Sequence, residues 1–197
     1  WREANSATEN GLFKVTYSNG LFIAVGEFGT IVTSSDGINW IYRGSFMREG
    51  NLLRVTYGNG TFVAVGSRGT ILTSPDGVNW TSQNSPTTES FFGVTYGNGI
   101  FVAVGSRGTL LTSRDAVNWT RQNSGTRAHL DSGTYGENGV WVVVGDQDDF
   151  SAVILTSLDT ITWKRRETGT RNRLRDVTYG NGMFVVVGEG GTIFTSP

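Results

Sequence analysis

The chain of 197 residues contains no cysteine and a single histidine, His129. Without cysteine there is no disulfide framework and no thiol chemistry. One histidine is too few for a zinc site of the usual composition. The sequence therefore excludes the disulfide-stabilised scaffolds and the cysteine-dependent enzymes.

Net charge and long apolar runs are also lacking. Lysine and arginine total 16 against 17 aspartates and glutamates, a net charge of −1, so nothing in the global charge attracts nucleic acid or anionic membranes. No apolar run approaches the roughly 18 residues of a transmembrane helix. We expect no nucleic-acid partner and no membrane insertion. Because the chain starts at Trp1, without an initiator methionine or a signal peptide, it is predicted to be a processed monomer or a module of a larger chain.

Glycine is plentiful, with 28 residues, and the sequence repeats itself. Residues 55–80 recur almost unchanged as residues 94–119, with weaker copies at 15–40, 133–163 and from 177 onward. A period near 40 residues is typical of solenoids and propellers. Because one copy is too small to bury its apolar faces alone, we predict a single domain of five units: 1–39, 40–79, 80–118, 119–162 and 163–197.

Each copy has the alternation of β-strands. In the second copy, strands are predicted at 53–57, 61–65, 70–74 and 79–83, and Asn59-Gly60 is the signal of a type I′ hairpin. Strands such as residues 61–65 are apolar on both faces, as expected for sheets covered on both sides. Five stacked four-stranded antiparallel sheets indicate an all-β fold, a five-bladed β-propeller. The last copy stops after a third strand, so we expect the strand beginning at Trp1 to complete it and close the ring.

A short motif recurs between the third and fourth predicted strands. It reads Ser-x-Asp-x-x-x-Trp at residues 34–40, 74–80, 113–119 and 157–163. This motif resembles the Asp-box, or BNR, repeat, and the preceding Gly-Thr-Ile-Leu-Thr-Ser pattern is similar to the propellers of the photosystem II assembly-factor family. The resemblance implies a propeller. It departs from the family in one residue fewer between Asp and Trp, in Ala116 and Thr160 at the glycine position, and in a smaller number of blades.

The residues of this motif have a structural explanation. Asp is expected to accept backbone N–H bonds in the turn, Gly to adopt a positive φ, and Trp to bury its ring between sheets. Trp141, which replaces the phenylalanine of the other copies, is also predicted to lie in the core. The tyrosines of the repeated Thr-Tyr pairs are expected to pack rather than to react.

Most differences between copies fall on one face of the predicted propeller. This variable loop face comprises the second-turn loops and the connections between repeats, and loops that vary on a constant scaffold are where binding usually occurs. Its arginines suit carboxylate, sulfate or phosphate, although solvated loop charge is the simpler explanation for them. The candidate binding residues are Phe28, Arg48, Arg68, Arg107, Arg127, His129, Arg171 and Arg173.

The fourth copy carries an insertion of about four residues between its second and third strands, rich in aspartate. Oxygen ligands from Asp146, Asp148 and Asp149 are a candidate Ca²⁺ site. The alternative is a solvated acidic loop that pairs with neighbouring arginines.

One position of the innermost strand carries Lys14, Arg54, Gly93, Ser132 and Asp176. The favoured interpretation is an ion-pair cluster. Glycosidase chemistry needs a second carboxylate at such a position, and no catalytic triad or phosphate-loop motif is present.

We therefore predict a non-enzymatic scaffold that recognises a protein or glycan through the variable loop face, in a secreted or cell-surface bacterial module without an organic cofactor. The alternative is a carbohydrate-active propeller, either a lectin or a sialidase-like glycoside hydrolase. Only Arg68 and Arg107 repeat among the exposed loops, so a lectin would have at most two equivalent sites. A third possibility is a scaffold whose second and third copies reflect recent duplication or engineering.

Overall fold

The computed structural model describes residues 3–146 and 152–196. The chain forms two compact units, one ending at Ser90 and the other starting at Phe91, and each is described by itself. Every regular element longer than three residues in the described part is a β-strand. These residues contain no helix with the length and apolar character needed to cross a bilayer.

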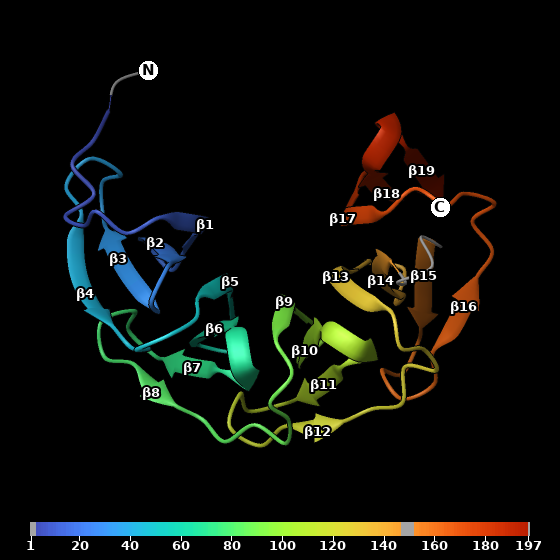
Figure 1. The fold of residues 1–197 in the computed structure, drawn as a ribbon, viewed down its shortest axis with the longest axis horizontal. Helices are drawn as coiled ribbons and strands as arrows, with labels where there is room; N and C mark the ends of the chain where they lie inside the picture. Colours follow the sequence, from blue (N-terminus) through green and yellow to red (C-terminus); the bar gives the residue numbers. More distant parts are fainter. Residues whose placement is uncertain (1–2, 147–151, 197) are drawn as a thin grey trace. The chain divides into compact units, whose positions relative to one another are not determined.

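The first unit contains two antiparallel sheets in which consecutive strands are neighbours (Figure 1). The first sheet consists of β1 (Leu12–Ser18), β2 (Leu21–Gly26), β3 (Thr30–Ser34) and β4 (Ile41–Ser45). The second consists of β5 (Leu52–Gly58), β6 (Thr61–Gly66), β7 (Ile71–Ser74) and β8 (Thr81–Ser82), with the short turn η1 (Ser67–Gly69) between β6 and β7.

The second unit contains three more sheets of the same order. The third sheet has β9 (Phe91–Gly97), β10 (Ile100–Gly105), β11 (Leu110–Ser113) and β12 (Thr120–Arg121), and includes η2 (Ser106–Gly108). The fourth has β13 (His129–Tyr135), β14 (Trp141–Asp146), β15 (Ala152–Ser157) and β16 (Lys164–Arg166). The fifth has β17 (Leu174–Gly180), β18 (Met183–Gly188) and β19 (Ile193–Ser196), with η3 (Glu189–Gly191).

The predicted five-sheet meander is thus confirmed, with one difference. Among the described residues the fifth sheet has three strands, and β19 pairs with β18. The predicted fourth strand was to begin at Trp1, which lies outside the described residues. Completion of this sheet, and with it closure of a ring, stays a prediction.

The first hairpin of most sheets has the predicted type I′ character. Asn59 and Gly60 have φ of 46° and 74°, and Asn98 and Gly99 have φ of 46° and 75°. Both central residues therefore lie in the left-handed region, which asparagine and glycine tolerate best. This turn chemistry fixes the register of the first two strands, so that Tyr57 pairs with Phe62 across the hairpin.

A glycine ends the second strand of four sheets and is the last residue but one of β14, and another backbone passes against several of these glycines. Leu52 pairs with Gly66, and the next pair is Arg54 with Val65, so the ladder is shifted by one residue at a β-bulge. A Cβ on Gly66 would lie 1.9 Å from the carbonyl oxygen of Asn51. The same approach of 1.9 Å occurs at Gly26 and Gly145. These glycines are required by contact rather than by φ.

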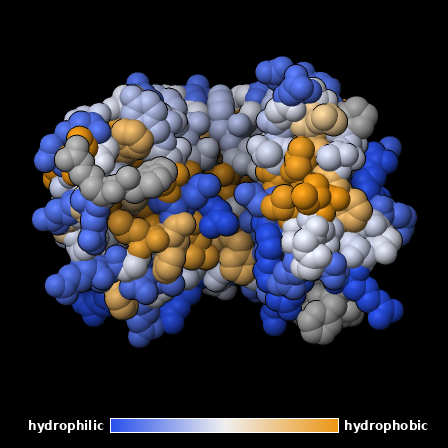
Figure 2. Space-filling view, turned by 90° about the horizontal axis from the view of Figure 1, so that it is seen from above, coloured by the Kyte–Doolittle hydropathy of each residue, from blue (hydrophilic) through white to orange (hydrophobic). Residues whose placement is uncertain are grey.

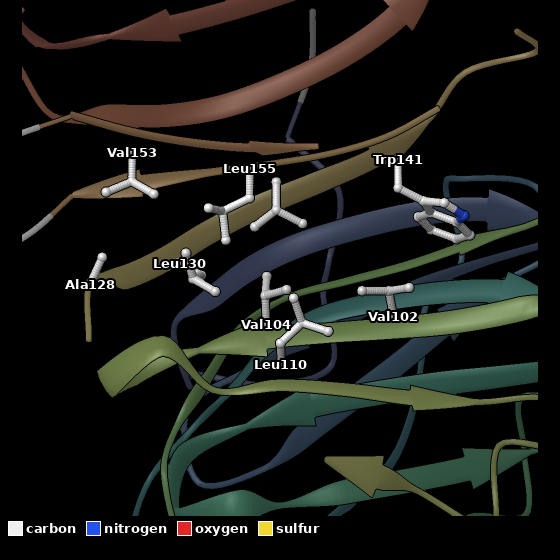
Figure 3. Packing of buried hydrophobic residues seen from close by; sticks show 9 residues of the cluster. Val102, Val104, Leu110, Ala128, Leu130, Trp141, Val153 and Leu155 are labelled. Carbon is white, nitrogen blue, oxygen red and sulfur yellow. The ribbon is translucent and has the colours of Figure 1, made fainter. Parts of the chain in front are cut away.

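The core lies between facing sheets within each unit. In the first unit, Ile23 and Ile31 of the first sheet pack against Leu52, Phe62 and other side chains of the second. In the second unit, the third and fourth sheets meet through one buried cluster (Figure 3). Its members are Val102, Val104, Leu110, Ala128, Leu130, Trp141, Val143, Val153 and Leu155. The predicted burial of Trp141 is confirmed, since its exposed fraction is 2%.

Some strand positions that are buried in the second sheet are exposed in the first and fifth sheets. Val15 on β1 is 53% exposed, whereas its counterpart Val55 on β5 is 5% exposed. Ile193 on β19 is 66% exposed, whereas its counterpart Ile71 on β7 is fully buried. The space-filling view likewise shows hydrophobic surface reaching solvent (Figure 2). Each unit therefore has an apolar face that its own residues leave uncovered.

Candidate functional site

The turns between third and fourth strands form one repeated structure, which we call the Ser-Asp turn (residues 34–40, 74–80, 113–119 and 157–163). The backbone N–H groups of Val78 and Asn79 both donate to Asp76 Oδ1 at 2.8 Å. Asn79 Nδ2 donates to Asp76 Oδ2 at 2.8 Å, and Ser74 Oγ donates to Oδ1 at 2.9 Å. The turn aspartate therefore accepts hydrogen bonds from backbone N–H groups of its own turn, as the sequence predicted.

These hydrogen bonds set the charge state of the turn aspartates. In Asp36, Asp76 and Asp115 the pKa is lowered, chiefly by the backbone N–H of the asparagine three residues on. The pKa of Asp159 is lowered to about 2, first by the backbone N–H of Thr162 and then by that of Ile161. Carboxylates held ionised in this way do not suit general acid catalysis at neutral pH.

We expect Asp159→Asn to lower Tm at pH 7 and to have less effect in acid. The unfolded carboxyl has a pKa of about 3.9, whereas the folded one has a pKa of about 2. A lowered pKa contributes stability above the unfolded value, and this stability is lost as the pH falls toward the folded value. Thermal melts from pH 7 to pH 2 should show the Tm difference shrinking below pH 4. Glu137→Gln, in another turn of the same sheet, is the control. A difference that does not change with pH would contradict the assignment.

The tryptophan of each Ser-Asp turn points back onto its own turn. The indole N–H of Trp119 donates to the carbonyl of Ala116 at 2.9 Å, and that of Trp163 donates to Thr160 at 3.1 Å. Trp119 is 8% exposed, and its ring centroid lies 6.4 Å from that of Phe101. Ala116 and Thr160 have φ of 62° and 63°, so the turn keeps its backbone where glycine is replaced. The predicted burial of the ring is thus confirmed for Trp119, whereas Trp40, Trp80 and Trp163 are half-buried.

The second-turn loops place a different side chain on the same strained backbone. Phe28, Arg68 and Arg107 have φ of 53°, 57° and 53°, a region that non-glycine residues rarely occupy. In the fifth sheet the same position is Gly190, with φ of 62°. Phe28 is 47% exposed, and Arg68 and Arg107 are also exposed. Strain held at an exposed tip is a common mark of function.

The first unit holds three of the predicted site residues. Arg68 Nη2 lies 2.7 Å from Glu49 Oε2 in an exposed ion pair, which contributes little to stability. Arg48 is exposed on the connection that follows β4. The structure thus keeps Phe28, Arg48 and Arg68 accessible to solvent.

In the second unit several charged groups converge on the variable loop face. Arg173 Nε lies 3.1 Å from Asp146 Oδ2, and Arg175 Nη1 lies 3.3 Å from Asp131 Oδ2. Arg175 also hydrogen-bonds Glu189. Burial raises the pKa of Asp131, and the negative charge of Asp146 raises it further. The sequence predicted Arg173 and Asp146 as site residues but not Arg175 or Glu189, because each of these ion pairs joins separate segments of the chain.

Of the other predicted residues in this unit, His129 lies next to that group, because it pairs with Asp146 in the β13–β14 ladder. Arg127 and Arg171 are exposed on their connections. His129 is half-buried, with its ring centroid 5.8 Å from that of Phe92. The contact with Phe92 gives His129 a packing role.

Only one of the three candidate calcium ligands lies within the described residues. Asp146 is buried and paired with Arg173, whereas Asp148 and Asp149 lie outside the described residues. Among residues 3–146 and 152–196, no group of three or more His, Cys, Asp or Glu is placed to hold a metal ion. The Ca²⁺ site stays a prediction.

The innermost position is partly explained within each unit. In the second unit Ser132 Oγ donates to Asp176 Oδ1 at 2.6 Å. In the first, Arg54 Nη1 donates to the carbonyl of Leu53 at 2.9 Å. The predicted ion-pair cluster would join residues of both units, and it stays a prediction.

A cavity of about 450 Å³ lies between the fourth and fifth sheets. Its apolar lining includes Val142 and Ile154 on one side and Phe184, Val186 and Phe194 on the other. The counterparts of these residues elsewhere belong to clusters that a turn tryptophan packs against. Trp80 packs against the cluster that includes Ile23 and Phe62, and Trp163 packs against the cluster that includes Val102 and Trp141. We call this cavity the β14–β18 cavity.

Several solved structures share this arrangement of sheets. No family model matches the chain, and no curated protein matches it. Among solved structures, YCF48 bound to D1 peptide aligns with a TM-score of 0.73 and 17% identity, covering 96% of this chain and 64% of that one. YCF48 from Cyanidioschyzon merolae aligns with a TM-score of 0.73 and 18% identity, covering 100% of this chain and 70% of that one.

A catalytically inactive virginiamycin B lyase from Staphylococcus aureus, with quinupristin, has a TM-score of 0.83 and 12% identity. The alignment covers 98% of this chain and 72% of the lyase. The chain has a propeller-like fold. It spans 64% of the length of the peptide-bound YCF48 chain. At these identities the likeness concerns the fold alone, because one fold hosts many functions.

Proposed function

We propose that this protein is a non-enzymatic interaction scaffold that binds a protein partner through the variable loop face. The observation that carries the proposal is the second-turn loop, where one strained backbone presents Phe28, Arg68 or Arg107 to solvent. A constant frame with different exposed tips is the arrangement expected of a recognition surface. The structural neighbour YCF48 with a D1 peptide supports a peptide as the kind of partner.

An enzymatic role is the second candidate, because the lyase neighbour is an enzyme of the same fold. In the described second unit, Asp131, Asp146 and Glu189 each pair with an arginine. Carboxylates neutralised by arginine suit structural pairing better than glycoside hydrolysis, which needs two carboxylates flanking the scissile bond. A lectin or sialidase-like role therefore ranks below the scaffold. The secreted or cell-surface bacterial setting stays a prediction.

A capture experiment tests the scaffold. Immobilised wild type is expected to retain a partner that Arg68→Ser/Arg107→Ser loses, because these tips carry the recognition. Arg114→Ser, on the opposite turn face, is the matched control and should retain it. Quantitative mass spectrometry of the captured proteins provides the readout. Equal capture by all three proteins, or hydrolysis of a glycoside panel at enzymatic rates, would contradict the proposal.

We also propose that the Ser-Asp turns are Asp-boxes and that the five sheets form a single closed propeller of five blades. The N-terminal strand would complete the fifth sheet. Its turn tryptophan, Trp1, would occupy the β14–β18 cavity beside β19. The uncovered apolar positions of each unit, such as Val15 and Ile193, would then have a partner.

The segment before β1 supports closure, because it is folded like the connections that follow complete fourth strands. Ser6 Oγ donates to the carbonyl of Thr8 at 2.8 Å, and the N–H of Asn10 donates to Thr8 Oγ1 at 3.2 Å. After β8, Ser85 and Thr87 make the same two bonds at 3.0 and 3.1 Å. Residues preceding Ser6 are thus counterparts of a fourth strand.

Introduced cysteines test the closure in a chain that has none of its own. Thr112 and Thr120 are paired neighbours on β11 and β12, and their counterparts in the proposed fifth blade are Thr195 and Arg2. Paired positions are near enough for a disulfide. Arg2→Cys/Thr195→Cys should oxidise to an intramolecular disulfide, as should the control Thr112→Cys/Thr120→Cys. If only intermolecular disulfides form, a second copy of the chain completes the sheet. If no disulfide forms, closure is contradicted.

A further inference from the structure

A polar cavity of about 360 Å³ lies at the edge of the third sheet, on the variable loop face. Two arginines line it: Arg107 from the second-turn loop and Arg121 from the outermost strand β12. The other lining residues are Gly108, Gln122, Asn123, Ser124 and Thr126. All seven are neutral or cationic. The cavity therefore combines two guanidinium groups with a lining that carries no negative charge.

The walls of this cavity are held by buried hydrogen bonds. Ser124 Oγ donates to the carbonyl of Gly108 at 2.7 Å, and the N–H of Gly108 donates to the carbonyl of Ala128 at 2.6 Å. Gln122 Nε2 donates to Thr112 Oγ1 at 2.9 Å. A loop and a connection 16 residues apart are thereby fixed to each other, so the site is formed before a ligand arrives. Preformed walls reduce the entropy lost on binding.

Arg107 occupies its position at a conformational cost. Its φ of 53° and ψ of 38° lie in the left-handed region, and the fifth sheet uses glycine at the same position. Glycine would meet the backbone requirement without strain. An arginine kept there points to a use for its side chain.

We propose that this cavity, the Arg107–Arg121 site, binds the carboxylate of an acidic side chain in an extended partner peptide. Guanidinium groups match carboxylates with paired, charge-assisted hydrogen bonds. Two arginines on separate segments provide for two carboxylate oxygens, or for two neighbouring acidic residues. The inference rests on the proposed scaffold function and names the chemistry of its partner.

The second sheet provides a natural comparison. It has the same loop, with Arg68 in place of Arg107 and a φ of 57°. The counterpart of Arg121 is Ser82, since these residues pair with Leu111 and Leu72 at the same point of their sheets. The second sheet therefore has one guanidinium at this point, where the third has two.

Fluorescence anisotropy with a dye-labelled hexaglutamate peptide tests the site in the complete chain. Arg121→Ser, which copies the second sheet, is expected to weaken binding about tenfold or more, equivalent to about 1.4 kcal/mol. Arg165→Ser is the matched control, because Arg165 pairs with Leu155 at the same point of the fourth sheet. Arg165→Ser removes the same charge and should leave the affinity for the peptide within about twofold of the wild-type value. Raising the salt should weaken wild-type binding.

A gain of function makes the test sharper. Ser82→Arg should build a second site beside Arg68 and raise the stoichiometry from one peptide per chain to two. Circular dichroism of each variant separates lost binding from lost folding. Equal weakening by Arg121→Ser and Arg165→Ser would mean attraction by general charge and would overturn the site. So would competition by inorganic sulfate as strong as that by the peptide, since the site would then be a small-anion site.

The outcomes also distinguish this inference from the scaffold function. Capture of a partner that needs Arg68 and Arg107, without binding of hexaglutamate, would leave the scaffold standing and remove the carboxylate site. Binding of hexaglutamate without capture of a partner would support the carboxylate site and remove the scaffold function.

Discussion

Gly66→Ala is expected to destabilise the protein by about 3 kcal/mol or more, the upper range for steric overpacking. An added Cβ would lie 1.9 Å from the carbonyl oxygen of Asn51 and 2.9 Å from the Cα of Leu52. The carbonyl oxygen of Asn51 accepts the N–H of Ser67, and Leu52 is held in the β5–β6 ladder, so the clash cannot be relieved by a side-chain rotation. Urea denaturation followed by far-UV circular dichroism measures the loss.

Gly180→Ala is the matched control for this prediction. Gly180 also ends a strand, on β17, but nothing lies within 4 Å of a Cβ added there. Its substitution should change the free energy of unfolding by no more than about 0.5 kcal/mol. A loss at Gly66 as small as that at Gly180 would show that the bulge relaxes around the methyl group.

Trp119→Ala is expected to lower the free energy of unfolding by about 3–5 kcal/mol, as removal of large buried aromatic side chains does. Trp119 is 8% exposed, and its indole N–H is bonded to the carbonyl of Ala116. The substitution removes the ring from beside Phe101 and leaves that carbonyl without its donor. Denaturant titration by circular dichroism is the measurement, because the tryptophan signal itself changes.

Trp40→Ala tests whether burial sets the size of the effect. Trp40 makes the same bond to its turn, at 3.3 Å from the carbonyl of Gly37, but it is only half-buried. Its loss should therefore cost less than that of Trp119. A change below about 1 kcal/mol for Trp119→Ala would mean that the ring contributes little to the core and would reopen a binding role for it.

Much of the fold could be predicted from local chemistry. The pair Asn59-Gly60 specifies a hairpin because both residues accept a positive φ. Asp76 specifies its turn because its carboxylate reaches backbone N–H groups two and three residues on. Such interactions span a few residues, so the sequence displays them directly. The fifth sheet is the exception, because its predicted fourth strand starts at Trp1, far from β19 in the chain.

The candidate site was harder to predict, because its partners lie far apart in the sequence. The loop that carries Arg107 drew attention, but Arg121 resembles ordinary strand charge until both line one cavity. Likewise Arg175 joins Asp131 across 44 residues. A repeat shows which loops vary, but not which side chains of different strands meet.

The sequence by itself determined the repeat, the strand order within each sheet and the chemistry of the turns. Period-two alternation and left-handed turn residues depend only on backbone conformation over short stretches. Only the tertiary structure decided that Gly66 is needed for close backbone contact, that Asp146 is neutralised by Arg173, and that Arg107 and Arg121 share a cavity. These features arise where strands distant in sequence pack together, and packing depends on distances in space that no local pattern encodes.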